Sequence, residues 1–489
     1  MTYAVGIDLG TSAVKVLVID ADGATVAKTH APYPLKHPAP DRTEQSCADW
    51  WRATCDATRR AVAGLDAAAI GGVGLSGQLN ALVLLDAEDE PLEDAWIWLD
   101  LRAREEARRF NERHPELLRR AIVNPANPIF VATKLAWMHR ERPDLAERLE
   151  RIAFAKDVIN HRLTDVLATD HSDASCSLLY DLQSGGWMPE LLELAGLHGA
   201  QLPVLRASDD VIGTVTRAAA SETGLPAGTP VVAGAGDVAA LALGSGTLLP
   251  GTCSITLGTA GHVVTARREI IPAGYNRIWQ MRHALPDLIL QLGLVMSGGL
   301  SLSWCSREFV RGGDVATALG LLPDTLPGAR GVTFLPFLEG AATPYQDPDL
   351  SAGFFGLRTH HTRADMVGAV LEGVAYNVRD CVEVFEELGS RIDEVRLSEG
   401  GSRSVAWCQI IADVLQRPVT TLRELDSSAL GAAMLALRAA TGGELAAVAK
   451  RVTRNLEATR FEPERDRADL YDGGYERYRA LTAAVQSVR

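Results

Sequence analysis

At 489 residues the chain is too long for one ordinary domain, and its length predicts two domains of roughly 200–250 residues each. Its hydrophobic fraction of 47% and charged fraction of 22% are typical of a soluble globular protein with sizeable cores. The formal net charge of −14 argues against nucleic acid or an anionic membrane as the main partner.

The cellular compartment is indicated by the N-terminus, the apolar stretches and the cysteines. No basic segment followed by an apolar run opens the chain, so we expect no signal peptide. The richest apolar stretch, Pro230–Leu249, contains an aspartate and several glycines and is not expected to span a membrane. The seven cysteines form no Cys-x-x-Cys pair, which favours a reducing compartment. These features together predict a cytoplasmic protein.

The first element is a hairpin. Ala4–Leu9 is a short apolar strand that carries one acid, Asp8, and Val14–Ile19 returns antiparallel to it. The turn between them, Gly10-Thr11-Ser12, offers backbone N–H groups and hydroxyls that can bind a phosphate. A carboxylate at the end of a buried strand is costly without a partner, so Asp8 suits a Mg²⁺ ion carried on a nucleotide, bound through water. The alternative is an ordinary hairpin with no ligand.

The next 200 residues are predicted to alternate strands and helices. A Gly-x-Gly-x-x-Gly match at Gly72–Gly77 lies in one strand and is followed by another strand, whereas a dinucleotide site requires a helix there. Residues 131–194 are predicted to be helical, with a loop at 169–175. The other predicted elements are strands at 25–34, 70–75 and 81–86 and helices at 47–63 and 103–113.

Asp237 lies at a turn between the buried strand that begins at Pro230 and an alanine-rich helix. A dinucleotide site here would need an acid about 20 residues on, and none occurs between Asp237 and Glu269. Two interpretations remain open for Asp237: a catalytic group, or a helix N-cap residue, for which Asp is favoured.

The second half repeats the first motif. The glycine-rich segment Gly244–Gly251 predicts a boundary that divides the chain into domains 1–247 and 248–489. Ser254–Gly261 then repeats the pattern of Ile7–Ala13, with Thr256 in place of Asp8, which suggests a duplicated fold that binds phosphate from both sides. Later elements are predicted as strands at 289–295 and 332–336, helices at 363–387, 405–415 and 430–440, and a helical tail from residue 456.

Three groups of residues resemble the phosphate and adenosine motifs of the actin-like ATPase superfamily: Gly6–Ser12 with Lys15, Gly258–Thr259 with Gly261, and Ser398–Ser402. The chain has no Gly-x-x-x-x-Gly-Lys, no Asp-Phe-Gly and no histidines at metal-binding spacing. A P-loop enzyme and a protein kinase are therefore excluded.

Within that superfamily the chain resembles the FGGY carbohydrate kinases. Ala352–Leu357 followed by Asp365–Glu372 is similar to one signature of that family, and Pro128–Trp137 is similar to the other. The subfamily it resembles most is the xylulokinases, because Gly234–Asp237 is similar to the segment that carries their catalytic base.

The resemblance implies an α/β fold of two ribonuclease-H-like domains, each a mixed sheet flanked by helices, with a cleft between them. It also implies transfer of the ATP γ-phosphoryl group to a terminal hydroxyl of an open-chain ketose or polyol, with Mg²⁺ as cofactor. Asp237 would be the catalytic base, and Asp8 would hold Mg²⁺ through water. The implied phosphate and nucleotide contacts are Gly10, Thr11, Ser12, Lys15, Gly258, Thr259, Gly400, Gly401 and Ser402. The implied sugar contacts are Gln78, Leu79, Asn80, Trp98 and Asp100.

The departures from the xylulokinase pattern lie at the sugar. Asn80 stands where those enzymes typically have histidine, and Leu99 stands where they have asparagine. A kinase for ribulose, erythritol or glycerol therefore stays open as an alternative. Two further alternatives are an actin-like ATPase switch without a sugar substrate and a sugar-responsive transcription factor. The protein could form a homodimer.

Overall fold

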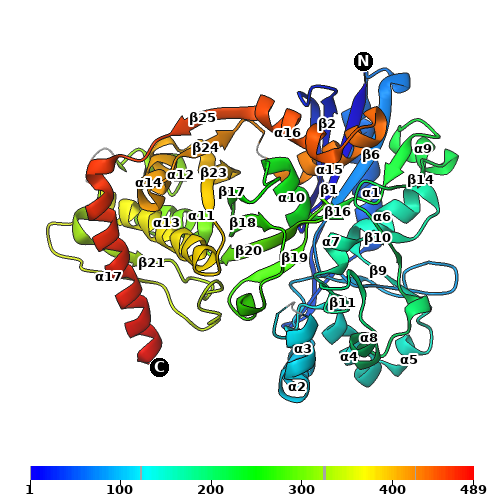
Figure 1. Cartoon of the computed structure of the whole chain (residues 1–489), viewed down its shortest axis with the longest axis horizontal. Coiled ribbons are helices and arrows are strands. Elements are labelled where there is room, and N and C mark those ends of the chain that lie inside the picture. Colours follow the sequence, from blue (N-terminus) through cyan, green and yellow to red (C-terminus); the bar gives the residue numbers. More distant parts are fainter. Residues whose placement is uncertain (1, 122–123, 323–326, 425, 489) are drawn as a thin grey trace.

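The computed structural model describes residues 2–121, 124–322, 327–424 and 426–488. Two seven-stranded sheets, one from each half of the chain, lie side by side in Figure 1. The N-terminal sheet has the order β14-β15-β6-β1-β2-β3, with β16 paired to β6. Its strands are β1 (Tyr3–Leu9), β2 (Ala13–Asp20), β3 (Thr25–Pro32), β6 (Ile70–Gly77), β14 (Val211–Thr214), β15 (Pro230–Val232) and β16 (Ala235–Gly236).

The C-terminal sheet has the order β19-β20-β18-β17-β23-β24-β25. Its strands are β17 (Gly251–Leu257), β18 (Gly261–Arg267), β19 (Trp279–Arg282), β20 (Ile289–Val295), β23 (Ile392–Ser398), β24 (Val419–Leu422) and β25 (Glu457–Phe461). Short pairs and triplets make up the smaller sheets: β4 (Lys36–Ala39), β5 (Arg42–Gln45) and β8 (Ala95–Trp96); β7 (Val83–Leu85) and β9 (Arg151–Ala153); β10 (Ala168–Asp170) and β13 (Val204–Arg206); β11 (Tyr180–Asp181) and β12 (Gly186–Trp187); β21 (Thr333–Leu335) and β22 (Gly353–Phe355).

The repeat predicted from the two hairpins is present in both sheets. β1 pairs antiparallel with β2 and parallel with β6, and β17 pairs antiparallel with β18 and parallel with β23. Asp8 lies opposite Lys15 and Ser76, at the position that Thr256 occupies opposite His262 and Ser398. The two halves therefore share one strand arrangement, as the predicted two-domain α/β fold requires.

Helices flank both sheets. In the N-terminal half they are α1 (Cys47–Val62), α2 (Arg104–Arg113), α3 (Pro115–Ala121), α4 (Val131–Glu141), α5 (Pro143–Ala146), α6 (Ala155–Thr164), α7 (His171–Ala174), α8 (Pro189–Ala195), α9 (Arg217–Thr223) and α10 (Asp237–Ser245). In the C-terminal half they are α11 (Gly298–Phe309), α12 (Val315–Leu319), α13 (Arg363–Glu387), α14 (Val405–Leu415), α15 (Ser427–Thr441), α16 (Leu445–Leu456) and α17 (Ala468–Ser487).

Two predictions of secondary structure are wrong. Residues 131–194 contain four short strands, β9 to β12, among their helices, and the predicted loop at 169–175 is the end of β10 followed by α7. The tail from residue 456 begins with strand β25 before it becomes helical. Strands β9, β10 and β25 pair with β7, β13 and β24, which lie far away in sequence, so no local pattern predicts them, whereas β11 and β12 pair with each other.

Helix α15 crosses from the C-terminal half to the N-terminal sheet, where Figure 1 shows it beside β1, β2 and β6. The contact is backbone to backbone. A Cβ added at Gly6 would lie 2.2 Å from the carbonyl oxygen of Ala429, and one at Gly74 would lie 2.2 Å from that of Ala432. Only glycine allows this approach, because any side chain on these strands would overlap the helix backbone. The predicted boundary at residues 247/248 stays a prediction.

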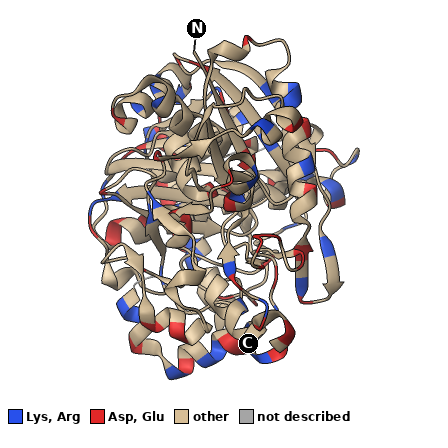
Figure 2. Ribbon diagram, turned by 90° about the vertical axis from the view of Figure 1, so that its right-hand side faces the viewer, with Lys and Arg blue, Asp and Glu red and all other residues tan. Residues whose placement is uncertain are grey.

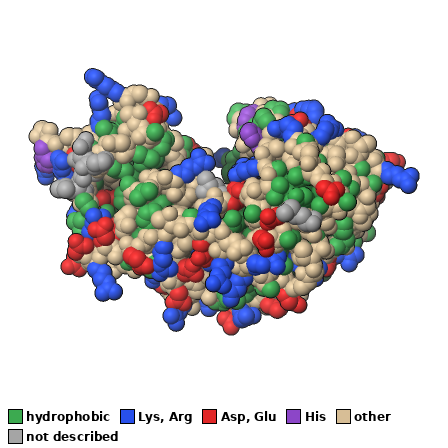
Figure 3. Space-filling view, turned by 90° about the horizontal axis from the view of Figure 1, so that it is seen from above, with side chains coloured by type: hydrophobic (Ala, Val, Ile, Leu, Met, Phe, Trp, Pro, Cys, Tyr) green, Lys and Arg blue, Asp and Glu red, His purple; other side chains and the backbone are tan. Residues whose placement is uncertain are grey.

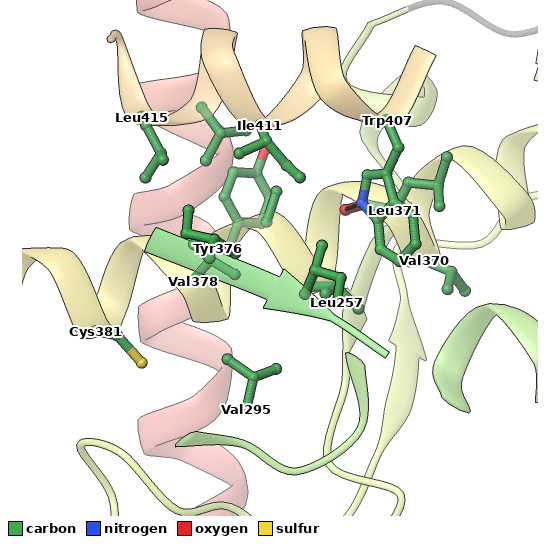
Figure 4. Close-up of a cluster of buried hydrophobic side chains, with 14 of the residues drawn as sticks. Leu257, Val295, Val370, Leu371, Tyr376, Val378, Cys381, Trp407, Ile411 and Leu415 are labelled. Atoms are coloured by element: carbon green, nitrogen blue, oxygen red, sulfur yellow. Dashed lines mark hydrogen bonds between the residues drawn. The ribbon is translucent and has the colours of Figure 1, made fainter. Parts of the chain in front are cut away.

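The C-terminal core fills the space between the second sheet and helices α13, α14 and α17. Figure 4 shows Leu257 and Val295 of the sheet facing Val378 of α13 and Ile411 of α14. Trp407 of α14 is buried there, and its indole N–H donates to the carbonyl oxygen of Leu371 at 3.2 Å.

The molecular surface is hollowed between two lobes in the space-filling view of Figure 3. In the ribbon view of Figure 2, Lys and Arg are interspersed with Asp and Glu along the chain. Among the described residues, no helix has the length and apolarity needed to cross a membrane.

We predict that Gly74→Ala destabilises the protein by about 1–3 kcal/mol, because the new methyl group overpacks the contact with α15. Urea or thermal denaturation measures this change. Gly473→Ala is the matched control, since a Cβ at this position in α17 has no neighbour within 4 Å. That control should be neutral or gain up to about 1 kcal/mol of helix stability. Equal effects of the two substitutions would contradict the close contact.

Candidate functional site

The buried carboxylate Asp8 ends β1, as predicted. It is 7% exposed, and its Oδ1 accepts a hydrogen bond from the Ser76 hydroxyl at 2.9 Å. Burial raises the pKa of Asp8, against the opposing effects of the Lys15 charge and the Ser76 hydrogen bond. Lys15 is thus close enough to Asp8 to act on it electrostatically.

Lys15 is held by a residue that the sequence analysis missed. Its Nζ lies 2.7 Å from Oδ1 of Asp426, and Lys28 forms ion pairs with both Asp426 and Glu424. Burial raises the pKa of Asp426, but Lys15 and Lys28 outweigh it and leave that pKa lowered. Asp426 is the N-cap residue of α15, so this network fixes the start of α15 to the first hairpin.

Asp237 is half-buried at the first turn of α10. Gly236 is the N-cap residue of α10, and Asp237 is the first residue of the helix, so the interpretation of Asp237 as the N-cap residue is wrong. The Asp237 carboxylate accepts from the N–H of Val238 at 2.7 Å. Burial, with the nearby charge of Asp8, raises the pKa of Asp237 to about 7, and the N–H of Leu79 opposes the rise. A carboxyl group with this pKa can accept a proton near neutral pH.

The turn that follows β6 carries two predicted sugar contacts. The Gln78 side-chain N–H donates to Oε1 of Gln45 at 2.8 Å, and Asn80 adopts a φ of 61°. Among the described residues, neither Oε1 of Gln78 nor Oδ1 of Asn80 has a hydrogen-bond partner, although both are buried. Buried polar atoms without partners are rare in proteins and call for an explanation, and a ligand that reaches this turn is one. The third residue of this turn, Leu79, is partly buried against the cluster around α10.

The buried side chain of Lys134 forms hydrogen bonds with this turn and with the segment that precedes Trp98. Its Nζ donates to the carbonyl oxygens of Asn80 at 2.8 Å, Trp96 at 3.2 Å and Ile97 at 2.7 Å. Burial lowers the pKa of Lys134 to about 7. The sequence analysis quoted Lys134 only within a signature, because its three carbonyl partners lie 37 to 54 residues away.

The remaining two predicted sugar contacts differ from each other. Trp98 is 37% exposed, and its indole N–H donates to Oγ1 of Thr11 at 2.9 Å, so it joins the sugar segment to the first phosphate turn. Asp100 is fully buried and faces the protein, where it accepts from Arg102 and from the N–H of Thr43. The prediction that Asp100 contacts the sugar stays a prediction. Asp100 anchors the segment that presents Trp98.

The first phosphate turn is closed by its own backbone. Gly10 N–H donates to the carbonyl oxygen of Ala13 at 3.2 Å, while the carbonyl of Thr11 accepts from the Gln45 side chain at 2.6 Å. Ser12 is exposed. Gln45, which holds both this turn and Gln78, is a second residue that the sequence analysis missed.

The second phosphate turn lies beside the predicted adenosine segment. A Cβ at Gly258 would lie 2.5 Å from Oε2 of Glu399, and one at Gly401 would lie 2.6 Å from Cβ of Leu257. Ser402 donates to the carbonyl of Glu399 at 2.7 Å, whereas Thr259 and Gly400 are exposed. Glu399 has φ 64° and ψ −157°, a backbone region that is almost restricted to glycine.

Electrostatic interactions show which predicted residues the fold brings together. Asp8 acts on both Asp237 and Glu399, and Lys15 acts on Asp8 and Glu399. Residues from both halves thus meet at the ends of β1 and β23. Oxygen donors of this kind suit Mg²⁺. Among the described residues, no group of three or more His, Cys, Asp or Glu could hold a metal ion.

Comparison with known proteins decides the family. Residues 3–244 match the N-terminal domain of the FGGY family of carbohydrate kinases, and residues 253–440 match its C-terminal domain. The chain belongs to the FGGY family of carbohydrate kinases.

Three relatives are similar to this FGGY kinase in sequence, and one of them is also compared with it in structure. It is 30% identical to the xylulose kinase of Bacillus subtilis (strain 168), with 100% of each chain covered. It is 35% identical to a "xyloylose kinase" from Brucella ovis, whose solved structure it matches with a TM-score of 0.91 over 100% of both chains. It is also 29% identical to the gluconokinase of Bacillus subtilis (strain 168), over 90% of this chain and 88% of the relative.

These similarities confirm the predicted fold class and the predicted enzyme class. This FGGY kinase is a phosphotransferase that acts on a small-molecule sugar, with ATP as the donor that the family implies. Family membership favours this activity over the ATPase switch and the transcription factor.

We predict that Asp237→Asn raises the thermal midpoint of unfolding at neutral pH. The pKa of Asp237 is raised from its ordinary 3.8 to about 7, so ionising it in the folded state costs stability that is lost progressively as pH rises from about 4 to 7. Asparagine does not ionise, so the thermal midpoint of Asp237→Asn should exceed that of the unmodified protein by an amount that grows over this pH window and is constant above it. The expected size is about 2–4 °C per kcal/mol of stability recovered. Scanning calorimetry between pH 4 and pH 9 measures it.

Asp426→Asn is the control of opposite sign, because the pKa of Asp426 is lowered by Lys15 and Lys28. Its substitution should reduce the midpoint above pH 4, where the carboxylate is ionised in both states. An Asp237→Asn midpoint that runs parallel to that of the unmodified protein at every pH would contradict the raised pKa.

Proposed function

We propose that this FGGY kinase transfers the γ-phosphoryl group of MgATP to D-xylulose, giving D-xylulose 5-phosphate and ADP. The observation that carries the proposal is the pairing of Asp237, with its pKa of about 7, with a turn whose polar atoms lack partners. Gly236 pairs with Gly77 in the sheet, and the N–H of Leu79 points to the Asp237 carboxylate. The relatives named xylulose kinase support the choice of sugar.

In the proposed reaction the terminal hydroxyl of the sugar gives its proton to Asp237. The hydroxyl oxygen forms a bond to the γ-phosphorus while the bond to the β-phosphate oxygen breaks and ADP leaves. Asp8 favours proton uptake, because its negative charge raises the pKa of Asp237. The protein's main task is positioning and charge compensation, since phosphoryl transfer needs little covalent help.

The nucleotide contacts are proposed from both halves of the chain. Asp8 would hold Mg²⁺ through water, and the bound ion would supply positive charge that offsets the phosphates. The phosphate and nucleotide contacts proposed are Gly10, Thr11, Ser12, Lys15, Gly258, Thr259, Gly400, Gly401 and Ser402. The charge of Lys15 is shared with Asp426, so we expect Lys15 to orient the phosphates more than to neutralise them.

The sugar is proposed to complete the hydrogen bonds that the protein leaves unmade. Hydroxyl groups of the ketose would donate to Oε1 of Gln78 and Oδ1 of Asn80, with the half-exposed ring of Trp98 beside them. Asn80 offers both a donor and an acceptor, which an uncharged polyol or a sugar acid can also use. A kinase for another ketose, polyol or gluconate is therefore the second candidate, and the gluconokinase relative favours it. A cytoplasmic homodimer with domains 1–247 and 248–489 completes the proposal.

We predict that D-xylulose stimulates ADP release at least about a hundredfold over the rate with MgATP alone, because the hydroxyl is a far better positioned acceptor than water. A coupled ADP assay measures this with D-xylulose, D- and L-ribulose, erythritol, glycerol and gluconate. Asp237→Asn should lose about 10²–10⁴-fold in turnover, as expected for removal of a general base.

Stimulation by another member of the panel would keep the kinase and change the sugar. If no member stimulated ADP release, or if Asp237→Asn kept full turnover, the proposed substrate class or the proposed base would be wrong.

A further inference from the structure

A buried polar network contacts the backbone immediately before Asp237 and has no role in the proposed chemistry. It consists of Lys156 on α6, Asp170 at the end of β10, and Ser172 and Asp173 on α7, and all four side chains are at most 1% exposed. We propose that Ser172 is a positioning residue that fixes the Asp237 carboxylate against the sugar turn. This inference rests on the proposed role of Asp237 as the base.

The first step is the backbone of Gly236. Its N–H donates to Oγ of Ser172 at 3.0 Å, and the next residue is Asp237, at the start of α10. This hydrogen bond ties the peptide that leads into α10 to a side chain on α7. Displacement of that peptide would carry the carboxylate with it.

The second step is the direction of the Ser172 hydroxyl. Ser172 Oγ donates to Oδ2 of Asp170 at 2.5 Å, and an ionised carboxylate can only accept. The Ser172 hydroxyl therefore donates its hydrogen to Asp170, and its oxygen accepts the hydrogen bond from the N–H of Gly236. Asp170 is itself held by the N–H of Ser172 at 2.9 Å and by the hydroxyl of Ser208 at 2.8 Å.

The third step links the network to the sugar turn. Lys156 Nζ lies 2.7 Å from Asp157, 3.2 Å from Asp170 and 3.3 Å from Asp173. The stem of the same lysine lies under the end of β6, where a Cβ at Gly77 would be 2.9 Å from Cβ of Lys156. One buried unit thus contacts both the residue before Gln78 and the residue before Asp237.

One ammonium group, that of Lys156, faces the three carboxyl groups of Asp157, Asp170 and Asp173, so the unit would carry a net negative charge if all three were ionised. Oδ2 of Asp173 lies 3.3 Å from Lys156 Nζ, the longest of the three contacts of that ammonium group with carboxyl groups. Burial raises the pKa of Asp173 well above its ordinary value, so it is the member that stays neutral. Asp170 accepts the hydrogen bond that holds the Ser172 hydroxyl.

The titratable groups that face Asp237 are few. Asp8 acts on Asp237 from β1, and Asp237 in turn acts on Cys176 in the segment after α7. Burial raises the pKa of the Cys176 thiol well above its ordinary value, so it stays neutral across the working range. The pKa of Asp237 therefore reports its burial and its separation from Asp8 and from the N–H of Leu79, all of which depend on its position.

The test is Ser172→Ala, which removes the hydroxyl and releases the Gly236 N–H. We expect kcat to fall about ten- to a hundredfold, as for a misplacement of about 1 Å, while the KM values for sugar and ATP stay within about threefold. We also expect the acid limb of the kcat–pH profile to move by at least about 0.5 pH unit. Ser172→Thr, which keeps a hydroxyl, should recover most of kcat and the original limb.

Ser177→Ala is the matched control. Ser177 is equally buried on the same segment, and its hydroxyl also donates once, to the carbonyl of Ala174, and accepts once, from the N–H of Leu179. It should lose comparable thermal stability and keep both kcat and the pH profile. Equal kcat and equal pH profiles in Ser172→Ala and Ser177→Ala would overturn the inference.

Asp237→Asn separates this inference from the proposed function. If Asp237→Asn is inactive and Ser172→Ala behaves like Ser177→Ala, the base is supported and only the positioning role is wrong. If Asp237→Asn retains turnover, the proposed base fails, and the positioning role fails with it.

Discussion

The start of helix α15 is the point on which the rest of the site depends. Its first residues contact three segments that are far apart in sequence: Asp426 holds Lys15 of β2, Ser427 bonds to Ser398 of β23, and Ser428 donates to the carbonyl of Asp237. The remainder of the helix lies directly on Gly6 and Gly74 of the N-terminal sheet. A single helix therefore contacts the first hairpin, strand β23 and the proposed base.

This arrangement explains why the site can hold several carboxylates close together. Asp8, Asp237, Glu399 and Asp426 interact electrostatically, with Lys15 and Lys28 as the ammonium groups among them. Like charges at short range in a poorly hydrated site favour proton uptake by one of them. Burial, with the charge of Asp8, raises the pKa of Asp237 to about 7, whereas Lys15 and Lys28 outweigh burial at Asp426 and leave its pKa lowered. Ionisation of Asp237, the proposed base, therefore lowers the stability of the folded protein.

The features predicted from the sequence were those encoded locally. The strand–Gly-Thr–strand pattern reported both hairpins, because turn chemistry and alternation lie within a dozen residues. Helices α13 and α14 were placed at their observed bounds for the same reason. Strand β10 and helix α7 were missed, because β10 pairs only with the distant β13 and α7 is a single short turn.

The site residues that were missed depend on long-range contacts. Asp426 lies 411 residues from Lys15, and Gln45 lies 33 residues from Gln78, so no spacing rule connects them. The sequence also does not show that Arg102, two residues on, engages both oxygens of Asp100. A motif shows which segment reaches the site, and only the fold shows which side chains of that segment face it.

The central claim is that Asp237 accepts the proton of the attacking sugar hydroxyl. The dependence of kcat/KM for the preferred sugar on pH, measured from pH 5 to 9, tests it most directly. The account predicts a plateau above about pH 7 and a tenfold fall per pH unit below it, following the pKa of Asp237. A value of kcat/KM that stays constant from pH 5 to pH 9 would contradict the assignment.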